Sequence, residues 1–174
     1  AGLLKGKTVA IDATTLEANA AMRSIVRRDT GDSYQAFLTG LAQASGIATP
    51  TREDLARLDR TRKKKTSNQD WTHPGDPDAR VAKMKDGRTH LAHKAEHAVD
   101  LDTGVVVAAE VHPADEGDTT TLPGTLKAAA ANLANVDRAP NPAKPAELIA
   151  DKGYHSRAVL KDLDDGPWKT RIAE

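Results

Sequence analysis

Two aspartates each follow a short apolar run and could together hold a metal ion. Asp12 lies in TVAIDA, residues 8–13, and Asp151 directly follows ELIA, residues 147–150. Both runs are typical of β-strands, and two carboxylates buried at neighbouring strand ends repel each other unless a cation lies between them. The cation that we predict is Mg²⁺ (or Mn²⁺), because this kind of ion takes one or two protein carboxylates and keeps its other sites for water and phosphate.

Such a site predicts chemistry on phosphodiesters. Two divalent ions about 4 Å apart can activate a water or a 3′-hydroxyl and stabilise the leaving oxygen, which is the chemistry of nucleases and strand transferases. The alternative is structural, since Asp is common at helix caps and turns, and Asp12 and Asp151 would then be a cap and a turn residue.

The elements that would position these aspartates follow a recognisable order. The predicted strands span residues 8–13, 90–100, 105–112, 147–151 and 168–174. The second and third form a hairpin with Gly104 in its turn, Asp118 caps the helix that follows, and another helix follows Asp151. Between the first two strands lies a long insertion, about residues 15–86, with one helix capped by Thr51 and Asp54. This order predicts an α/β fold, a mixed sheet of the ribonuclease-H-like type with helices on its faces.

Composition narrows the function classes. The 174 residues predict a single domain, the formal net charge is zero, and the absence of cysteine excludes disulfides and thiolate metal sites. No apolar run approaches the roughly 18 residues of a membrane span, and no signal peptide is recognisable. We therefore expect a cytoplasmic protein without a membrane partner.

Four blocks of the sequence resemble the catalytic core of DDE transposases of bacterial insertion sequences. The resemblance is to the IS4/IS5-like superfamily and its IS1182-type branch. It rests on VAIDATTLEANA, DPDARVAKMKDGRTHLAHKAEHAVD, GVVVAAEVHPADEGDTTTL and ELIADKGYHSRAVLKDL. The resemblance implies a ribonuclease-H-like fold, a divalent metal, and cleavage and joining of DNA at transposon ends and target, with a homodimer in the intact protein.

The resemblance also implies roles for single residues. The first catalytic Asp matches Asp12 and the second matches Asp151, whereas Asp118 is given a capping or supporting role. The third acidic residue of the family lies on a helix downstream of the last strand. Glu174 instead resembles the family's glutamate at the end of the fifth strand, which is not the catalytic one. We therefore expect a fragment that is incomplete at its C-terminus and inactive by itself. The alternative is a truncated, non-catalytic DNA-binding remnant. A metal-dependent nuclease or a phosphatase is less favoured. Phosphatases with an aspartate nucleophile need a second acidic residue two positions after the first, and this sequence has Thr14 there.

Two further motifs compete for function. HKAEH, residues 93–97, matches the inverted zinc-peptidase pattern, but that motif needs a helix and the local alternation predicts a strand. We instead expect this strand to carry His and Lys toward solvent or DNA.

RTRKKK, residues 60–65, holds five cations in six positions and is either a solvated helix end or a DNA-backbone contact. If all five engaged phosphate, the log-log salt slope would be roughly −4 to −5. The predicted DNA-binding residues are Arg60, Arg62, Lys63, Lys64 and Lys65.

Overall fold

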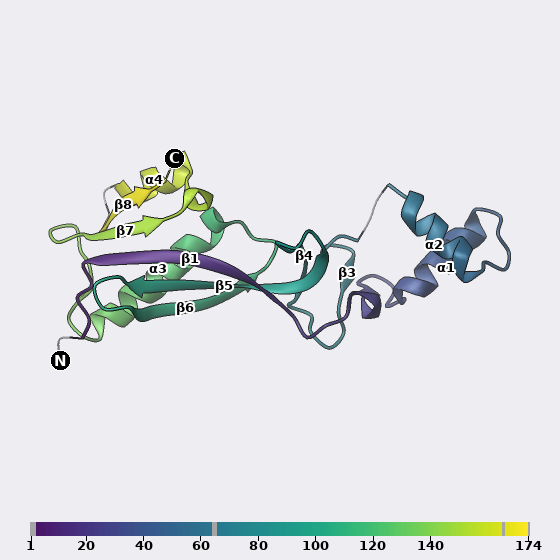
Figure 1. Ribbon diagram of the computed structural model, residues 1–174, viewed down its shortest axis with the longest axis horizontal. Coiled ribbons are helices and arrows are strands. Elements are labelled where there is room, and N and C mark those ends of the chain that lie inside the picture. Colours follow the sequence, from purple (N-terminus) through teal and green to yellow (C-terminus); the bar gives the residue numbers. More distant parts are fainter. Residues whose placement is uncertain (1–2, 64–65, 165, 174) are drawn as a thin grey trace. The chain divides into compact units, whose positions relative to one another are not determined.

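The computed structural model describes residues 3–63, 66–164 and 166–173. The chain folds into two compact units (Figure 1). The first contains the chain up to Leu16, Lys94–His112 and the residues from Glu116 on, and the second contains Glu17–His93 with Pro113–Asp115. Strand β5 (Thr89–Asp100) therefore contributes its first part to the second unit and its remainder to the first.

A mixed sheet forms the centre of the first unit. Besides β5, its strands are β1 (Thr8–Glu17), β6 (Val105–Pro113), β7 (Ala146–Ala150) and β8 (Trp168–Ile172). The order across the sheet is β6-β5-β1-β7-β8, with β7 parallel to both β1 and β8. The predicted mixed sheet and ribonuclease-H-like strand order are confirmed, although β1 continues past the predicted strand end to Glu17.

The register between β1 and β7 brings together two strands that lie far apart in the sequence. Val9 pairs with Leu148, and Ile11 pairs with Ala150. The next residues along these two parallel strands are Asp12 and Asp151. Because parallel strands advance in step, both aspartates lie at the same edge of the sheet.

One core binds the helices of this unit to the sheet. Helix α3 (Asp118–Ala134) contributes Leu122, Leu126 and Leu133, and α4 (Arg157–Asp164) contributes Val159. They pack with alternate residues of the strands, which is the pattern expected when one face of a strand is covered. Between β7 and α4 lies a short 3₁₀ helix, η2 (Lys152–Tyr154).

A buried carboxylate fixes the start of β1. Asp100, at the end of β5, is fully buried and accepts hydrogen bonds from the backbone amides of Lys5 at 2.7 Å and Gly6 at 3.0 Å. A third amide, that of Asp102, donates to it from the hairpin turn at 3.0 Å. Burial opposes its charge, but these amide hydrogen bonds outweigh burial and lower the pKa of Asp100.

The second unit is more ordered than the sequence suggests. It contains η1 (Met22–Ser24), β2 (Val26–Arg27), α1 (Tyr34–Ala44), α2 (Arg52–Thr61), β3 (Trp71–Thr72) and β4 (Arg80–Lys83). The expectation of a single helix in this region is wrong, because Ser33 caps a second one by accepting from the Ala36 amide. Gly40 and small side chains obscure the helical periodicity of α1. The predicted capping box of Thr51 and Asp54 is confirmed at the start of α2.

An aromatic cluster holds part of this unit together. Tyr34 and Phe37 of α1 contact the Trp71 ring at centroid distances of 5.1 and 5.2 Å. The guanidinium groups of Arg27 and Arg62 lie over these rings at 5.5 to 5.7 Å. Cation–π attraction therefore adds to the burial of an otherwise small core.

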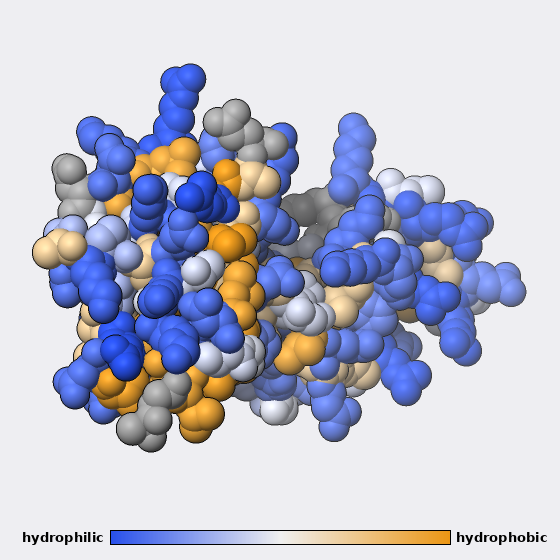
Figure 2. All heavy atoms as spheres, turned by 60° about the vertical axis from the view of Figure 1, so that its left-hand side comes forward, coloured by the Kyte–Doolittle hydropathy of each residue, from blue (hydrophilic) through white to orange (hydrophobic). Residues whose placement is uncertain are grey.

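Charged residues make up 29% of the sequence. Figure 2 shows hydrophilic side chains over most of the face that it draws, with apolar side chains in smaller patches between them. Among the described residues, no helix combines the length and apolar character that crossing a membrane requires.

Candidate metal centre at the β1–β7 edge

Asp12 lies on β1 immediately after the last buried residue of that strand. Ile11 is 3% exposed, whereas Asp12 and most of the residues after it are exposed. The Asp12 Oδ1 atom accepts from the Ala13 amide at 2.8 Å. The expectation of a buried carboxylate is wrong here, because the core under β1 ends at Ile11 while the strand itself continues into solvent.

Asp151 caps the short helix η2 that follows β7. Its Oδ1 accepts from the Gly153 amide at 2.8 Å, and its side chain is also exposed. The structural alternative assigned a turn role to Asp151 and a cap role to Asp12, and the structure has Asp151 as the N-cap of η2 instead. The expectation of burial is wrong for this residue too. Capping uses one carboxylate oxygen and leaves the other without a hydrogen bond among the described residues.

The donor set at this edge fits a hard divalent cation. Two exposed carboxylates follow paired residues of parallel strands, and each retains an oxygen that accepts no hydrogen bond from the described residues. Mg²⁺ takes one or two protein carboxylates and otherwise keeps water. The described residues bring together no group of three or more His, Cys, Asp or Glu side chains that could hold a metal. Among the described residues, the candidate site at this edge is therefore limited to the two carboxylates of Asp12 and Asp151.

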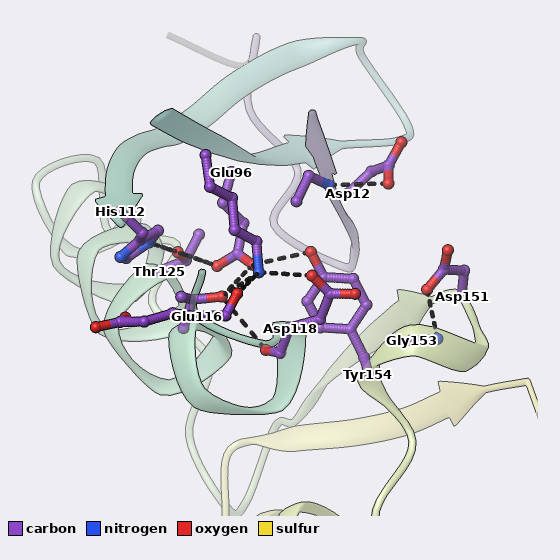
Figure 3. A network of polar contacts seen from close by, with 12 residues as sticks. Asp12, Glu96, His112, Glu116, Asp118, Thr125, Asp151, Gly153 and Tyr154 are labelled. Atoms are coloured by element: carbon purple, nitrogen blue, oxygen red, sulfur yellow. Dashed lines mark hydrogen bonds and ion pairs between the residues drawn. The ribbon is translucent and has the colours of Figure 1, made fainter. Parts of the chain in front are cut away.

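A buried polar network, which the sequence did not predict, lies beside these aspartates. Its centre is Glu96 on β5 (Figure 3). The Glu96 side chain is fully buried. Glu96 Oε1 accepts from the hydroxyls of Thr121 and Tyr154, both at 2.8 Å, and Oε2 accepts from the hydroxyl of Thr125. These three hydroxyls come from α3 and η2, so Glu96 joins three elements.

Lys94 supplies the positive charge in this network. It precedes Glu96 by two residues on β5, so both side chains point to the same face of the strand. Its ammonium group lies 2.5 Å from Asp118 Oδ1 and 3.9 Å from Glu96 Oε1, and it donates to the Thr121 hydroxyl at 3.0 Å. A cation between two carboxylates offsets the cost of burying their charge.

The Tyr154 hydroxyl stays protonated in this environment. Burial raises its pKa, and the hydrogen bond to Glu96 and the negative charges of Glu96, Asp118 and Asp12 raise it further. Tyr154 is therefore a hydrogen-bond donor at every physiological pH.

The HKAEH motif lies on a strand, as predicted. Residues 93–97 fall within β5, so the helical geometry of a zinc peptidase is absent from this described segment. His93 faces Asp76, with Nε2 3.0 Å from Oδ2, and His97 is exposed. The expectation that Lys94 points to solvent is wrong, because this side chain is buried against Glu96 and Asp118.

Asp118 begins α3 but does not cap it. The N-cap residue is Gly117, and the Asp118 carboxylate pairs with Lys94 instead. Its other oxygen faces the Asp151 turn: a Cβ placed on Gly153 would clash with Asp118 Oδ2 and would lie 3.0 Å from Asp151 Oδ1. The Asp118 carboxylate therefore lies close against the turn that carries Asp151.

The predicted basic segment is partly engaged within its own unit. Arg62 donates to Asp59 at 2.7 Å and lies over the rings of Tyr34 and Phe37. The Lys63 side chain is exposed just beyond α2, and Arg60 is exposed on the helix itself. Lys64, Lys65 and Glu174 lie outside the described residues.

Comparison with known proteins identifies the family. No curated protein and no solved structure matches the chain. The family model described as "Transposase DDE domain" matches residues 50–173, well over half of the chain, and this range includes Asp118 and Asp151 but not Asp12. The chain therefore belongs to the transposase DDE domain family.

Proposed function

We propose that Asp12 and Asp151 hold a divalent metal in a site that cleaves and joins DNA phosphodiesters at the ends of an insertion sequence. Membership of the family supports a polynucleotidyl transferase that depends on metal and acts on DNA. The observation that carries the residue assignment is the parallel register of Ile11 with Ala150. It makes Asp12 and Asp151 neighbours at one edge of the sheet.

Different residues of the chain would bind the metal and orient its ligands. The chemistry that bound Mg²⁺ supplies is activation of a water or 3′-hydroxyl and stabilisation of the leaving oxygen. Asp12 and Asp151 provide exposed carboxylate oxygens that DNA phosphates and solvent can reach. Asp151 is oriented by the Gly153 amide, and Asp12 by the Ala13 amide.

The exposure of these aspartates supports a substrate of macromolecular size. A phosphodiester within duplex or single-stranded DNA can approach a carboxylate on an open sheet edge, but it cannot enter a closed pocket. We assign the transposon ends and the target DNA as the substrates of the site formed by Asp12 and Asp151. We also propose that the protein belongs to the IS1182-type branch of the family.

Metal titration monitored by amide NMR tests the assignment. Mn²⁺ added to the 174-residue chain should broaden signals around Asp12 and Asp151, and Mg²⁺ should shift the same signals. Asp12→Asn and Asp151→Asn should each abolish the effect, because one carboxylate in water binds these ions weakly. Asp162→Asn, on the exposed surface of α4, is the matched control and should leave it unchanged. Broadening that survives in both site variants would contradict the assignment.

A further inference from the structure

Tyr154 attaches the turn that carries Asp151 to the interior of the first unit. Tyr154 lies three residues after Asp151 and is 1% exposed. Its hydroxyl donates to Glu96 Oε1 at 2.8 Å, while its backbone amide donates to the Asp151 carbonyl at 3.2 Å. One residue thus links the metal-site turn to a buried carboxylate on β5.

Glu96 is a rigid acceptor. The hydroxyls of Thr121 and Thr125, one helical turn apart on α3, donate to different oxygens of its carboxylate. Lys94 lies 3.9 Å from Oε1, and His112 Nε2 lies 3.7 Å from Oε2. A carboxylate that accepts two hydrogen bonds from α3 and lies beside Lys94 on β5 and His112 on β6 has little freedom to follow a moving partner.

The neighbouring position on the turn is also confined. Gly153 approaches the Asp118 carboxylate so closely that an added Cβ would clash with Oδ2. Asp118 is in turn fixed by its 2.5 Å ion pair with Lys94. The Asp151 turn is therefore held at Tyr154 by Glu96 and bounded at Gly153 by Asp118.

Stability alone does not explain this arrangement. Burying a carboxylate costs free energy that an apolar side chain of similar volume would avoid, and such replacements are often neutral or stabilising. A directional hydrogen bond does what apolar packing cannot, because it fixes the orientation of the turn. Metal sites depend on such support, since ligands must be held in position by the groups behind them.

We propose that Glu96 is a positioning residue for the metal site, which through the Tyr154 hydroxyl holds the Asp151 turn beside Asp12. This role rests on the proposed function of Asp12 and Asp151. Glu96 itself is fully buried and touches neither metal nor DNA in this role.

The decisive variant is Tyr154→Phe, because it removes one hydroxyl and keeps the ring. Mn²⁺ affinity at Asp12 and Asp151, from NMR line broadening of the full chain, should fall about 10-fold or more, the usual effect of losing a group that supports a metal ligand. Hydrogen exchange at the Gly153 amide, which donates to Asp151, should become faster. Glu96→Gln keeps an oxygen that can accept from Tyr154 and should lose less affinity than Glu96→Ala.

Tyr34→Phe is the matched control. The Tyr34 hydroxyl also donates to a carboxylate, Asp59 at 2.6 Å, but in the second unit. Its removal should leave Mn²⁺ affinity and Gly153 exchange unchanged. If Tyr154→Phe unfolds the chain, the comparison of Glu96→Gln with Glu96→Ala supplies the same readouts.

Two failures can be told apart. Wild-type Mn²⁺ affinity together with unchanged Gly153 exchange in Tyr154→Phe would overturn the positioning role and leave the metal site standing. Absence of Mn²⁺ broadening near both aspartates in the wild-type chain would contradict the metal site itself, and the positioning role with it.

Discussion

Lys94 and Asp118 form an ion pair of 2.5 Å that joins β5 to the first turn of α3. The Lys94 side chain is 6% exposed, so its charge has left bulk water and depends on its protein partners. Those partners include Glu96 two residues along the same strand and the Glu116 carbonyl at 3.3 Å. A buried cation and a buried anion on one strand face bind the sheet to the helix that lies against it.

Lys94→Met should destabilise the chain strongly. The variant fills similar space but leaves the Glu96 carboxylate buried without its cation, a change that typically costs about 3–5 kcal/mol. Urea unfolding monitored by circular dichroism measures the loss. Lys127→Met, at an exposed position of α3, should change stability by no more than about 0.5 kcal/mol. Adding Glu96→Gln to Lys94→Met should recover part of the loss, and strict additivity of the two changes would argue against the charge pairing.

Gly153→Ala should disturb the Asp151 turn through a steric clash. The new Cβ would overlap Asp118 Oδ2, and the ion pair with Lys94 opposes movement of that carboxylate. We expect a loss of about 1–3 kcal/mol in unfolding free energy, the usual cost of overpacking. Gly40→Ala, inside α1 with nothing within 4 Å of the added Cβ, should instead stabilise by about 0.5–1 kcal/mol. A neutral Gly153→Ala would show that Asp118 is free to move.

Asp100→Asn should reveal a pH-dependent contribution to stability. Amide hydrogen bonds lower the pKa of Asp100 in the folded chain, so its stabilisation is complete above the ordinary aspartate pKa of about 3.9 and is lost as pH falls through the lower folded pKa. At pH 7 the variant should be less stable by about 1.5–3 kcal/mol, the value of a hydrogen bond to a charged group. Unfolding free energies measured from about pH 7 down to about pH 2 should converge. The exposed Asp102→Asn serves as control, and a constant gap would contradict the assignment.

Arg62 and Lys63 should behave differently although both lie in the predicted DNA-binding segment. Arg62→Ala removes a guanidinium that bonds Asp59 and lies over Tyr34 and Phe37, so it should lower the melting temperature of the second unit. Lys63→Gln, at an exposed position, should leave the melting temperature unchanged. It should also reduce the magnitude of the log-log salt slope of DNA binding by about 1 if that lysine contacts phosphate.

Fluorescence anisotropy at several salt concentrations, with calorimetry on the same samples, makes this comparison. An unchanged salt slope in Lys63→Gln would exclude a phosphate contact by Lys63. A melting temperature unaffected by Arg62→Ala would contradict the structural role of the aromatic cluster.

The alternation of apolar residues was enough to predict the strands of the first unit. Val9 and Ile11 mark β1, and Leu148 marks β7, because a strand with one buried face repeats every two residues. Helix α1 was not predicted. Gly40 and the alanines of α1 weaken its apolar periodicity, and a serine such as Ser33 is common in turns as well as at helix caps. The prediction that Asp12 and Asp151 are buried was wrong. The residues of a strand do not show how far the neighbouring elements cover it.

The sequence by itself determined the strand order and the two aspartates that follow the apolar runs of two paired strands, because periodicity and turn residues act locally along the chain. Only the tertiary structure decided which polar groups are buried. Lys94 and Glu96 lie on the same face of a strand. The sequence alone does not decide whether that face is buried or exposed to solvent. They became a buried pair because α3 and η2, which come later in the sequence, bring Thr121, Thr125 and Tyr154 to them.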